Sequence, residues 1–169
     1  DMAARQGLQL TLLQPSVVFG ADDRLINVFA QLQALAPVVP LACAQAPFQP
    51  VWVQDVAQAL VHAVLSPTSH GQRYELVGPE VFTLAQLVRL AGEWAGHPRP
   101  IWPLPEALAQ AQAWVMEHLP GPTLMSRDNL ASMQTPSVAS GACPGLSALG
   151  VLHAAHISSV FPARTPPAR

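Results

Sequence analysis

The fold is decided by two segments, QPSVVFG at residues 14–20 and PVWVQDVAQAL at residues 50–60. Each segment contains an apolar run, at residues 17–19 and 51–53, that is typical of a strand covered on both faces. The first run then breaks at Gly20, and the second passes into a helix after Val53. Strands that alternate with helices indicate an α/β fold with a parallel sheet. Together the two segments predict the later half of a nucleotide-binding α/β domain.

The same alternation extends along the chain. Asp55 is expected to cap the helix after the second segment, and Thr83 with Gln86 matches a capping box for the next helix. Strands are predicted at residues 8–19, 51–53 and 73–77, and helices at residues 22–35, 55–65 and 83–96. The helix at 55–65 is expected to bury one apolar stripe, formed by Val56, Leu60, Val64 and Leu65.

The composition limits the classes of protein that fit. The chain has 169 residues, enough for one ordinary domain, and 50% of them are hydrophobic while 11% are charged. Soluble domains usually carry about a quarter charged residues. With so few charged residues, the surface is expected to have apolar areas that are covered by a missing part of the chain or by a partner. The net charge of −2, with scattered basic residues, argues against a nucleic-acid partner.

The two cysteines and the hydropathy of the chain further limit the classes of protein that fit. Cys43 and Cys143 are expected to be free buried thiols, because two cysteines so far apart suggest neither a disulfide framework nor a metal site. No run reaches about 18 apolar residues, so a transmembrane segment is not expected. The chain opens at Asp1 without a signal peptide, which we interpret as a sign of truncation.

The sequence contains no complete catalytic constellation. A dinucleotide site needs a glycine-rich turn after its first strand, so that backbone N–H groups meet the pyrophosphate, and no such turn occurs here. Reductases and epimerases of the tyrosine–lysine type need a lysine four residues after the tyrosine. The sole tyrosine is Tyr74, Gly78 stands at that spacing, and the chain has no lysine. We therefore predict no catalytic residue and no metal ligand in these residues.

The remaining polar and aromatic candidates have ordinary structural explanations. Ser16 lies in no nucleophile elbow; it either ends a strand or contacts the nicotinamide end of a cofactor. His153 and His156 could share a helical face, but no third ligand stands nearby. Glu75 is expected to be a solvated charge. The tryptophans are expected to pack in the core, although one lies in a proline-rich loop that could line a cleft (Trp102); the others are Trp52, Trp94 and Trp114.

These segments resemble a known family. QPSVVFG, followed by Asp22 and Asp23, is similar to the R-P-S-V-V-F-G-x-x-D segment of atypical and extended short-chain dehydrogenases/reductases. PVWVQDVA resembles their P-V-x-V-x-D-V-A strand–helix junction, and YELVGPE at 74–80 resembles the next strand. LMSRDNL at 124–130 and PGLSALGV at 144–151 narrow the resemblance to bacterial relatives of the NAD(P)-binding, epimerase-like accessory subunit of respiratory complex I. The resemblance covers nearly all of residues 1–155.

The resemblance implies a fold in three parts. Residues 1–80 would form the C-terminal half of a Rossmann-like, doubly wound NAD(P)-binding domain, and residues 81–150 a small, mostly helical lobe for substrate or partner. Residues 151–169 would form an irregular tail that departs from the family's usual ending. The family's glycine-rich N-terminal half is missing, and it is the first partner that we expect.

The resemblance also implies a cofactor contact. It places Pro15, Ser16, Val17 and Val18 beside the nicotinamide ribose and carboxamide. Gln14 stands where the family usually has arginine, which weakens any phosphate or sugar contact made by that arginine. NAD(P) is expected in the intact parent, with the choice between NAD and NADP left open. No cofactor is expected for this chain alone.

Three functions fit these observations. The first is a non-catalytic or weakly catalytic, accessory-subunit-like protein that binds NAD(P) for structural or assembly purposes. The second is an active NAD(P)-dependent nucleotide-sugar epimerase, dehydratase or reductase whose tyrosine and lysine lie in the missing half. The third is an interaction or assembly protein without cofactor, suggested by the low charge and the proline-rich loop at 37–50. We expect a cytoplasmic location, with a protein-complex partner and a peripheral place at the inner membrane left open.

Overall fold

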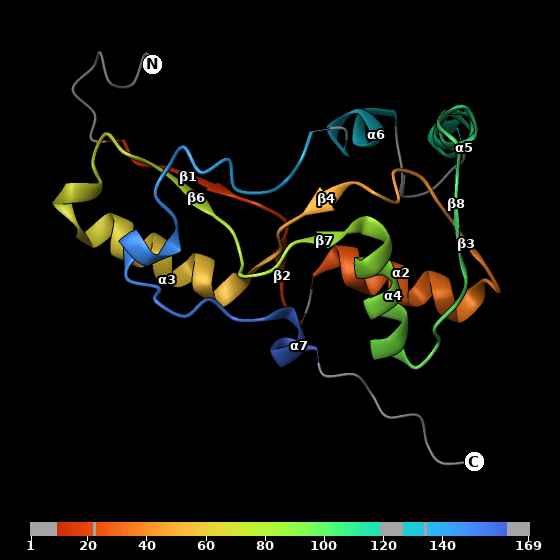
Figure 1. Cartoon of the computed structure of the whole chain (residues 1–169), viewed down its shortest axis with the longest axis horizontal. Coiled ribbons are helices and arrows are strands. Elements are labelled where there is room, and N and C mark those ends of the chain that lie inside the picture. Colours follow the sequence, from red (N-terminus) through yellow and green to blue (C-terminus); the bar gives the residue numbers. More distant parts are fainter. Residues whose placement is uncertain (1–9, 22, 119–126, 134, 162–169) are drawn as a thin grey trace. The chain divides into compact units, whose positions relative to one another are not determined.

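The computed structural model describes residues 10–21, 23–118, 127–133 and 135–161, and these residues form two compact units (Figure 1). The first unit is drawn from residues 10–23, 49–81 and 138–161, and the second from residues 24–48 and 82–137. The chain therefore leaves the first unit twice and returns to it twice. The boundaries at residues 80 and 150 that the sequence suggests remain a prediction.

The first unit contains two pairs of parallel strands. β1 (Leu12–Pro15) pairs with β6 (Arg73–Leu76), and β2 (Val18–Phe19) pairs with β5 (Val51–Trp52). Parallel pairing is what an α/β fold requires, so the predicted fold class is confirmed.

The strand predicted over residues 8–19 is interrupted, although its first two residues lie outside the described part of the chain. The interruption falls at Ser16 and Val17, where the backbone changes partner. The Ser16 N–H donates to the Leu76 carbonyl (3.0 Å), and the Val17 carbonyl accepts from the Val51 N–H (2.9 Å). Each side of the break therefore joins a different strand.

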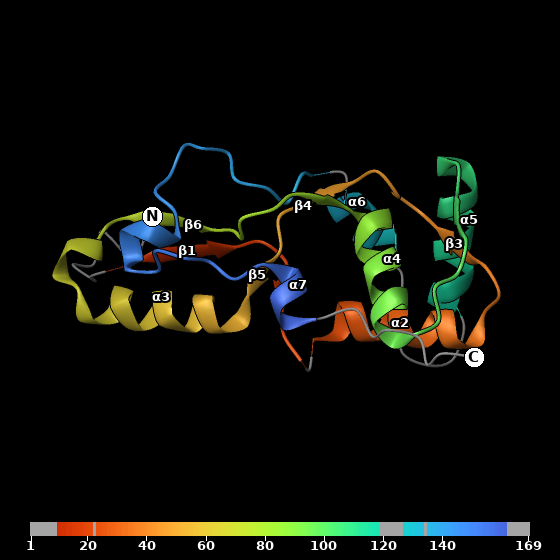
Figure 2. The same ribbon diagram turned by 60° about the horizontal axis from the view of Figure 1, so that its bottom comes forward.

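Helix α3 (Val53–Leu65) covers the β1–β6 pair in both views (Figures 1 and 2). Its buried face carries Ala59 and Ala63, whose small side chains let the helix approach the strands closely. Two short turns also contact α3, η1 (Pro67–Ser69) and η2 (Leu146–Leu149), and η2 contributes Leu146 and Leu149 to the core. The buried members of this core are Val51, Ala59, Ala63, Tyr74, Leu76, Leu146, Leu149 and Val151.

Of the apolar stripe expected on this helix, Val56 is partly buried against the core, but the other three residues are exposed. Leu60 is 52% exposed, Val64 73% and Leu65 76%. Asp55, Ala59 and Ala63 face inward instead, at the i, i+4, i+8 spacing of one helical face. Most sides of the helix are apolar, so the sequence pattern could not distinguish the buried face from the exposed one.

Asp55 does not cap α3, contrary to the expectation. The helix begins at Val53, and its N-cap residue Trp52 makes no side-chain capping bond. Asp55 lies inside the first turn with 5% of its surface exposed, and its Oδ2 accepts a hydrogen bond from the Ala155 N–H at 2.8 Å. A carboxylate near a helix N-terminus is favoured by the helix dipole. Asp55 therefore joins residues 138–161 to the start of the helix.

The two histidines do not share a helical face. His153 lies in an irregular segment, whereas His156 is the N-cap residue of the short helix α7 (Ile157–Val160). The His156 Nδ1 atom lies 3.1 Å from Glu80 Oε2, within the same unit. The histidine therefore pairs with a carboxylate rather than with its neighbour.

The second unit combines helices with short strand pairs. β3 is parallel to β8, β4 is antiparallel to β7, and helix α2 packs against helix α4. The elements are α2 (Arg24–Leu35), β3 (Val39–Leu41), β4 (Pro47–Phe48), β7 (Phe82–Thr83), α4 (Leu84–Ala95), β8 (Ile101–Pro103), α5 (Glu106–His118) and α6 (Arg127–Met133).

Helix α4 begins as the sequence predicts and is joined to α2 by a buried amide. The Thr83 hydroxyl accepts from the Gln86 N–H and the Gln86 side chain accepts from the Thr83 N–H, which confirms the capping box. Gln33 of α2 is fully buried and donates to the Val88 carbonyl of α4 at 2.7 Å. Gly92 provides the room, because a Cβ there would lie 2.2 Å from Gln33 Oε1.

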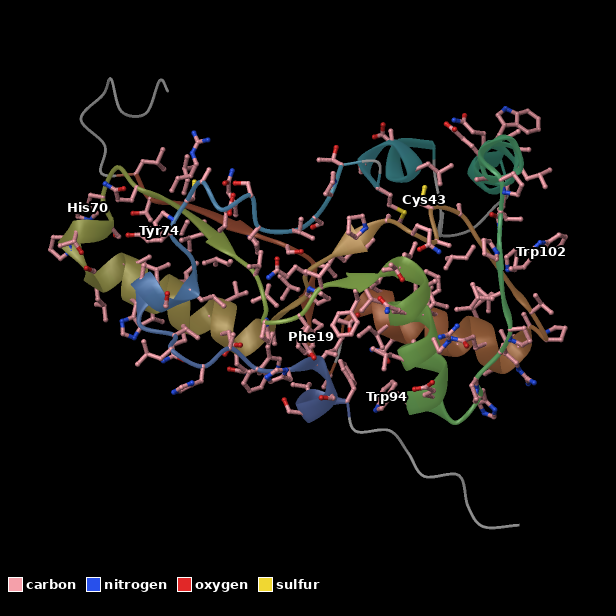
Figure 3. The ribbon with its side chains drawn as sticks, in the orientation of Figure 1. Phe19, Cys43, His70, Tyr74, Trp94 and Trp102 are labelled. Carbon is pink, nitrogen blue, oxygen red and sulfur yellow. The ribbon has the colours of Figure 1, made fainter. Side chains whose placement is uncertain are left out.

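Two of the tryptophans are not core residues. Trp102 on β8 is 61% exposed and Trp114 on α5 is 52% exposed (Figure 3 labels Trp102). The expectation of core packing was wrong for both. In the part of the chain that the structure describes, no helix combines the length and the apolar character needed to cross a membrane.

Candidate functional site

The candidate site lies in the first unit, where β1 and β6 end and β2 begins. Pro15 closes β1 and is exposed, while Ser16, Val17 and Val18 are partly buried in the step to β2. Ligands of open α/β sheets bind in the crevice at the carboxyl ends of the strands. The four residues predicted to contact the cofactor therefore stand together at a strand end of the kind that such folds use, and their contact with a cofactor stays a prediction.

The step from β1 to β2 is held on both sides. Val18 lies opposite Val51 and Phe19 opposite Trp52 in the parallel register. Phe19 is 1% exposed, and its ring centroid lies 6.1 Å from that of Phe161 (Figure 3). Because Phe19 is anchored in this way, the backbone just before it has a fixed path.

The loop after β6 is fixed by close backbone contacts. A Cβ on Gly78 would lie 1.9 Å from the Pro50 carbonyl oxygen, so only glycine fits there. Gln49 Nε2 donates to the Gly78 carbonyl at 2.8 Å, and Gln49 Oε1 accepts from the Ala139 N–H at 3.0 Å. Sequence reasoning missed Gln49 and Gly78 as supporting residues. A glycine directly after a strand was the only available signal.

The carboxylate of Glu75 on β6 binds the returning chain, the segment at residues 138–161 that re-enters the first unit. The Glu75 carboxylate accepts hydrogen bonds from the Ser140 hydroxyl, the Ser140 N–H (3.0 Å) and the Gly141 N–H (3.3 Å). The Ser140 hydroxyl contributes most to lowering the pKa of Glu75, and the backbone N–H groups of Ser140 and Gly141 lower it further. Glu75 is thus a solvated charge, as the sequence suggests, and it also binds Ser140 and Gly141 of the returning chain.

Pro15, Ser16, Val17 and Val18 carry no carboxylate, imidazole, thiol or amine. Tyr74 is 6% exposed and belongs to the core beneath α3 (Figure 3), so its hydroxyl lies in packing and not at the strand ends. Within the described ranges, no three histidine, cysteine or acidic side chains cluster in a way that could hold a metal ion. Pro15, Ser16, Val17 and Val18 present short side chains and backbone at this strand end.

Sequence comparison relates the chain to one group of mitochondrial proteins. No family model matches it. It is 29% identical over 142 residues to NADH dehydrogenase [ubiquinone] 1 alpha subcomplex subunit 9 of Arabidopsis thaliana, covering 78% of this chain and 35% of that protein. The subunit of the same name from Rattus norvegicus is 27% identical over 142 residues, covering 83% of this chain and 37% of the relative.

Solved structures with a similar fold are sugar-nucleotide enzymes. A nucleoside-diphosphate-sugar epimerase from Staphylococcus aureus superposes with a TM-score of 0.67 at 15% identity, over 95% of this chain and 54% of that one. The dTDP-glucose 4,6-dehydratase of Bacillus anthracis, solved with NAD, gives 0.60 at 12% identity, over 94% and 44%. Identities this low show the fold alone.

The fold is thus like that of these epimerase and dehydratase structures, which agrees with the α/β, Rossmann-like fold predicted from the sequence. In sequence the chain is similar to the mitochondrial proteins named NADH dehydrogenase [ubiquinone] 1 alpha subcomplex subunit 9. It spans a little over a third of the length of these curated relatives.

Proposed function

We propose that the chain closes the nicotinamide end of an NAD(P) site in a complex I accessory-subunit-like protein, where the cofactor serves structure or assembly. The observation that carries the proposal is the step from β1 to β2. It puts Pro15, Ser16 and Val17 at the carboxyl ends of β1 and β6 and Val18 at the start of β2, and ligands of open α/β sheets bind at the carboxyl ends of strands. The structural relatives solved with NAD support this choice of ligand.

A structural rather than catalytic use of the cofactor rests on the chemistry of the strand ends. The one tyrosine is in the core and the chain has no lysine. Turnover by the parent would therefore depend on groups outside these 169 residues. An active nucleotide-sugar epimerase or reductase is the alternative, favoured by the enzymes that share the fold.

The first unit also has two surfaces suited to the remainder of an α/β domain. Among the described strands, β1 has one hydrogen-bonded neighbour, β6, which leaves its other edge available for a further strand. On α3, Leu60, Val64 and Leu65 form an exposed apolar face. We propose that the glycine-rich half of the parent adds strands at β1 and covers α3. A peripheral place in a membrane-bound complex is part of the same proposal; the expected cytoplasmic location stays a prediction, and the named relatives are mitochondrial.

The deciding experiment is mass spectrometry of small molecules released on denaturing the purified parent protein, with this chain run alongside. Bound NAD(H) or NADP(H) in the parent, and none in this chain, is expected. Val17→Asp in the parent should abolish the bound nucleotide, whereas Val81→Asp, at an exposed position of the same unit, should not. Absence of nucleotide from the parent after incubation with excess cofactor would contradict the proposal and favour a cofactor-free interaction protein.

A further inference from the structure

The outward face of the β3–β8 pair, in the second unit, is apolar. In the parallel register Pro40 lies opposite Trp102, and the neighbours of Pro40 on β3, Val39 and Leu41, are 0% and 1% exposed. Side chains alternate between the two faces of a strand, so Pro40 and Trp102 lie on the face opposite to the buried one. Trp102 is 61% exposed, and Figure 3 shows it on the side of β8 away from α4.

The same face continues toward the start of both strands. The register that sets Pro40 against Trp102 sets Val38 against Pro100. Val38 is 39% exposed, and Pro100 is exposed as well. Four uncharged side chains therefore form one surface, which we call the β3–β8 patch: Val38, Pro40, Pro100 and Trp102.

Prolines limit the addition of a further strand at the edges of this pair. Among the described strands, β3 and β8 bond to each other alone. The Val39 N–H donates to β8 at 3.0 Å, and the Leu41 carbonyl accepts from beyond β8 at 2.9 Å. Pro40 lies between these two residues and faces the free edge of β3, where it offers no N–H. Pro103 removes a donor from the free edge of β8 in the same way, so a partner has more to gain on the face than at the edges.

The chemistry of the patch fits a proline-rich segment in the polyproline II conformation. Such a segment has no N–H at its prolines, so it offers an apolar ridge and carbonyl acceptors, and aromatic-lined surfaces bind it. Trp102 supplies both an aromatic face and an indole N–H donor. The three residues of β8 span about 10 Å, which matches one polyproline II turn of about three residues. Prolines and a valine have few rotamers, so ordering them on binding costs little entropy.

The charge beside the patch is basic. His97 and Arg99 precede β8 and are exposed, and no acidic residue occurs between Glu93 and Glu106. Arg99 is held in place by Gln33, because its backbone N–H donates to the Gln33 Oε1 atom at 3.1 Å and its Nε to the Gln33 carbonyl at 3.0 Å. An acidic residue next to the prolines of a partner would therefore be attracted to this end of the patch.

We infer that the β3–β8 patch binds a proline-rich segment of a partner protein, as one polyproline II turn with an acidic residue beside it. This is an interaction surface of a different kind from the strand ends at Pro15–Val18, which are proposed to contact a nucleotide. The patch belongs to the second unit alone, so peptide binding there does not depend on NAD(P) binding by the parent.

The test is fluorescence polarisation of labelled peptides titrated with the full chain. The first peptide has two glutamates followed by six prolines, the second has lysines in place of the glutamates, and the third has alanines in place of the prolines. Saturable binding of the first is expected, with a Kd on the order of 0.1 mM, as for a small transient interface. The lysine peptide should bind several-fold more weakly, and this difference should shrink in high salt. Equal binding of the alanine peptide, or no saturable binding of the first, would overturn the inference.

The two exposed tryptophans of the second unit provide a matched pair of variants. Trp102→Ala should weaken binding of the first peptide at least about tenfold, whereas Trp114→Ala, at a 52% exposed position of α5, should leave it unchanged. Trp102→Phe keeps an aromatic face without the N–H donor and should give an intermediate loss, which keeps the test valid if Trp102→Ala does not fold. Equal losses for Trp102→Ala and Trp114→Ala would contradict the inference. So would binding to phosphatidylcholine vesicles, or self-association, that depends on Trp102 while the peptide does not bind.

Discussion

Gly78 stands where the backbone of the first unit leaves no room for a side chain. A Cβ there would lie 1.9 Å from the Pro50 carbonyl oxygen and 3.1 Å from its carbon, and neither atom can swing aside as a side chain could. We expect Gly78→Ala to lower the free energy of unfolding by about 2–3 kcal/mol. Urea unfolding followed by circular dichroism measures the change.

Gly145→Ala is the matched control for this substitution. A Cβ at Gly145 would meet the Glu75 carbonyl oxygen at 3.6 Å, an ordinary contact, and its φ of −100° suits any residue. We expect a change within about 0.5 kcal/mol. Equal losses for the two variants would show that the close approach at Gly78 does not exist in solution.

Glu75 makes the stability of the returning chain depend on pH. Its pKa is lowered from the ordinary value of 4.5, first by the Ser140 hydroxyl and then by backbone N–H groups. A carboxyl whose folded pKa lies below its unfolded pKa stabilises the fold above the unfolded pKa, and the effect is lost as pH falls through the folded pKa. Glu75→Gln should therefore lower Tm at neutral pH and have no effect in acid below the folded pKa.

Melting curves of the wild type and of Glu75→Gln, recorded between neutral and acidic pH, measure the difference in Tm. Ser140→Ala removes the largest cause of the lowered pKa, so it should reproduce part of the loss with the same pH dependence. A Tm difference between wild type and Glu75→Gln that stays constant across this range would mean that the carboxylate charge plays no part.

For single residues, the sequence showed which acidic side chains stand near strand ends, but it did not show what they contact. Asp55 and Glu75 were both visible as acidic residues near strand ends, but their partners, Ala155 and Ser140, lie 100 and 65 positions away. No periodicity reports a contact over such a distance. The roles of the two carboxylates therefore required the folded chain.

Helix α3 exposes the apolar side chains that the sequence places in the core. Leu60 and Val64 are more than half exposed, whereas Ala63 is 5% exposed. We expect Leu60→Gln and Val64→Gln each to change the free energy of unfolding of this chain by less than about 0.5 kcal/mol. Ala63→Gln should cost at least about 2 kcal/mol, because it forces a longer polar side chain into a packed core.

The same three variants also test the proposed partner. In the parent protein, Leu60→Gln and Val64→Gln should become destabilising, since the added half of the domain would bury them. Chemical denaturation of each variant, in this chain and in the parent protein, gives the two changes in the free energy of unfolding. If the exposed-face variants destabilise the isolated chain as much as Ala63→Gln does, the helix is turned the other way.

Local sequence signals predicted where α4 begins and ends, but they did not predict which face of α3 is buried. The Thr83–Gln86 capping box predicted the start of α4, and Gly96, with a φ of 75°, ends it in the left-handed conformation. The break between β1 and β2 had a local signal that was not used, because Pro15 and Ser16 interrupt the apolar run before Val17. The strand partner changes at that point.

For the whole molecule, the sequence resemblance predicted the fold class and the candidate site together. Pro15, Ser16, Val17 and Val18 were assigned by family likeness, and the structure adds their place at the ends of parallel strands. The supports of that strand end, Gln49 and Gly78, could not be predicted. Their role depends on contacts between segments that are distant in the sequence.

The open edge of β1 should limit the behaviour of this chain when it is isolated. β6 is the one hydrogen-bonded neighbour of β1 among the described strands, and an unpaired strand edge is a template for association. We expect low stability, irreversible thermal unfolding and concentration-dependent aggregation, measured by light scattering during heating. Reversible, cooperative unfolding of a monomer would contradict this expectation.

A lysine placed on β1 distinguishes aggregation through the edge of that strand from non-specific aggregation. Gln14 is an exposed residue of β1, so Gln14→Lys should slow aggregation, because a lysine on an edge strand opposes pairing with a second copy. Gln58→Lys adds the same charge at an exposed position of α3 and should have a smaller effect. If both lysines slow aggregation equally, net charge controls it. If only Gln14→Lys does so, the free edge of β1 is where the rest of the sheet belongs.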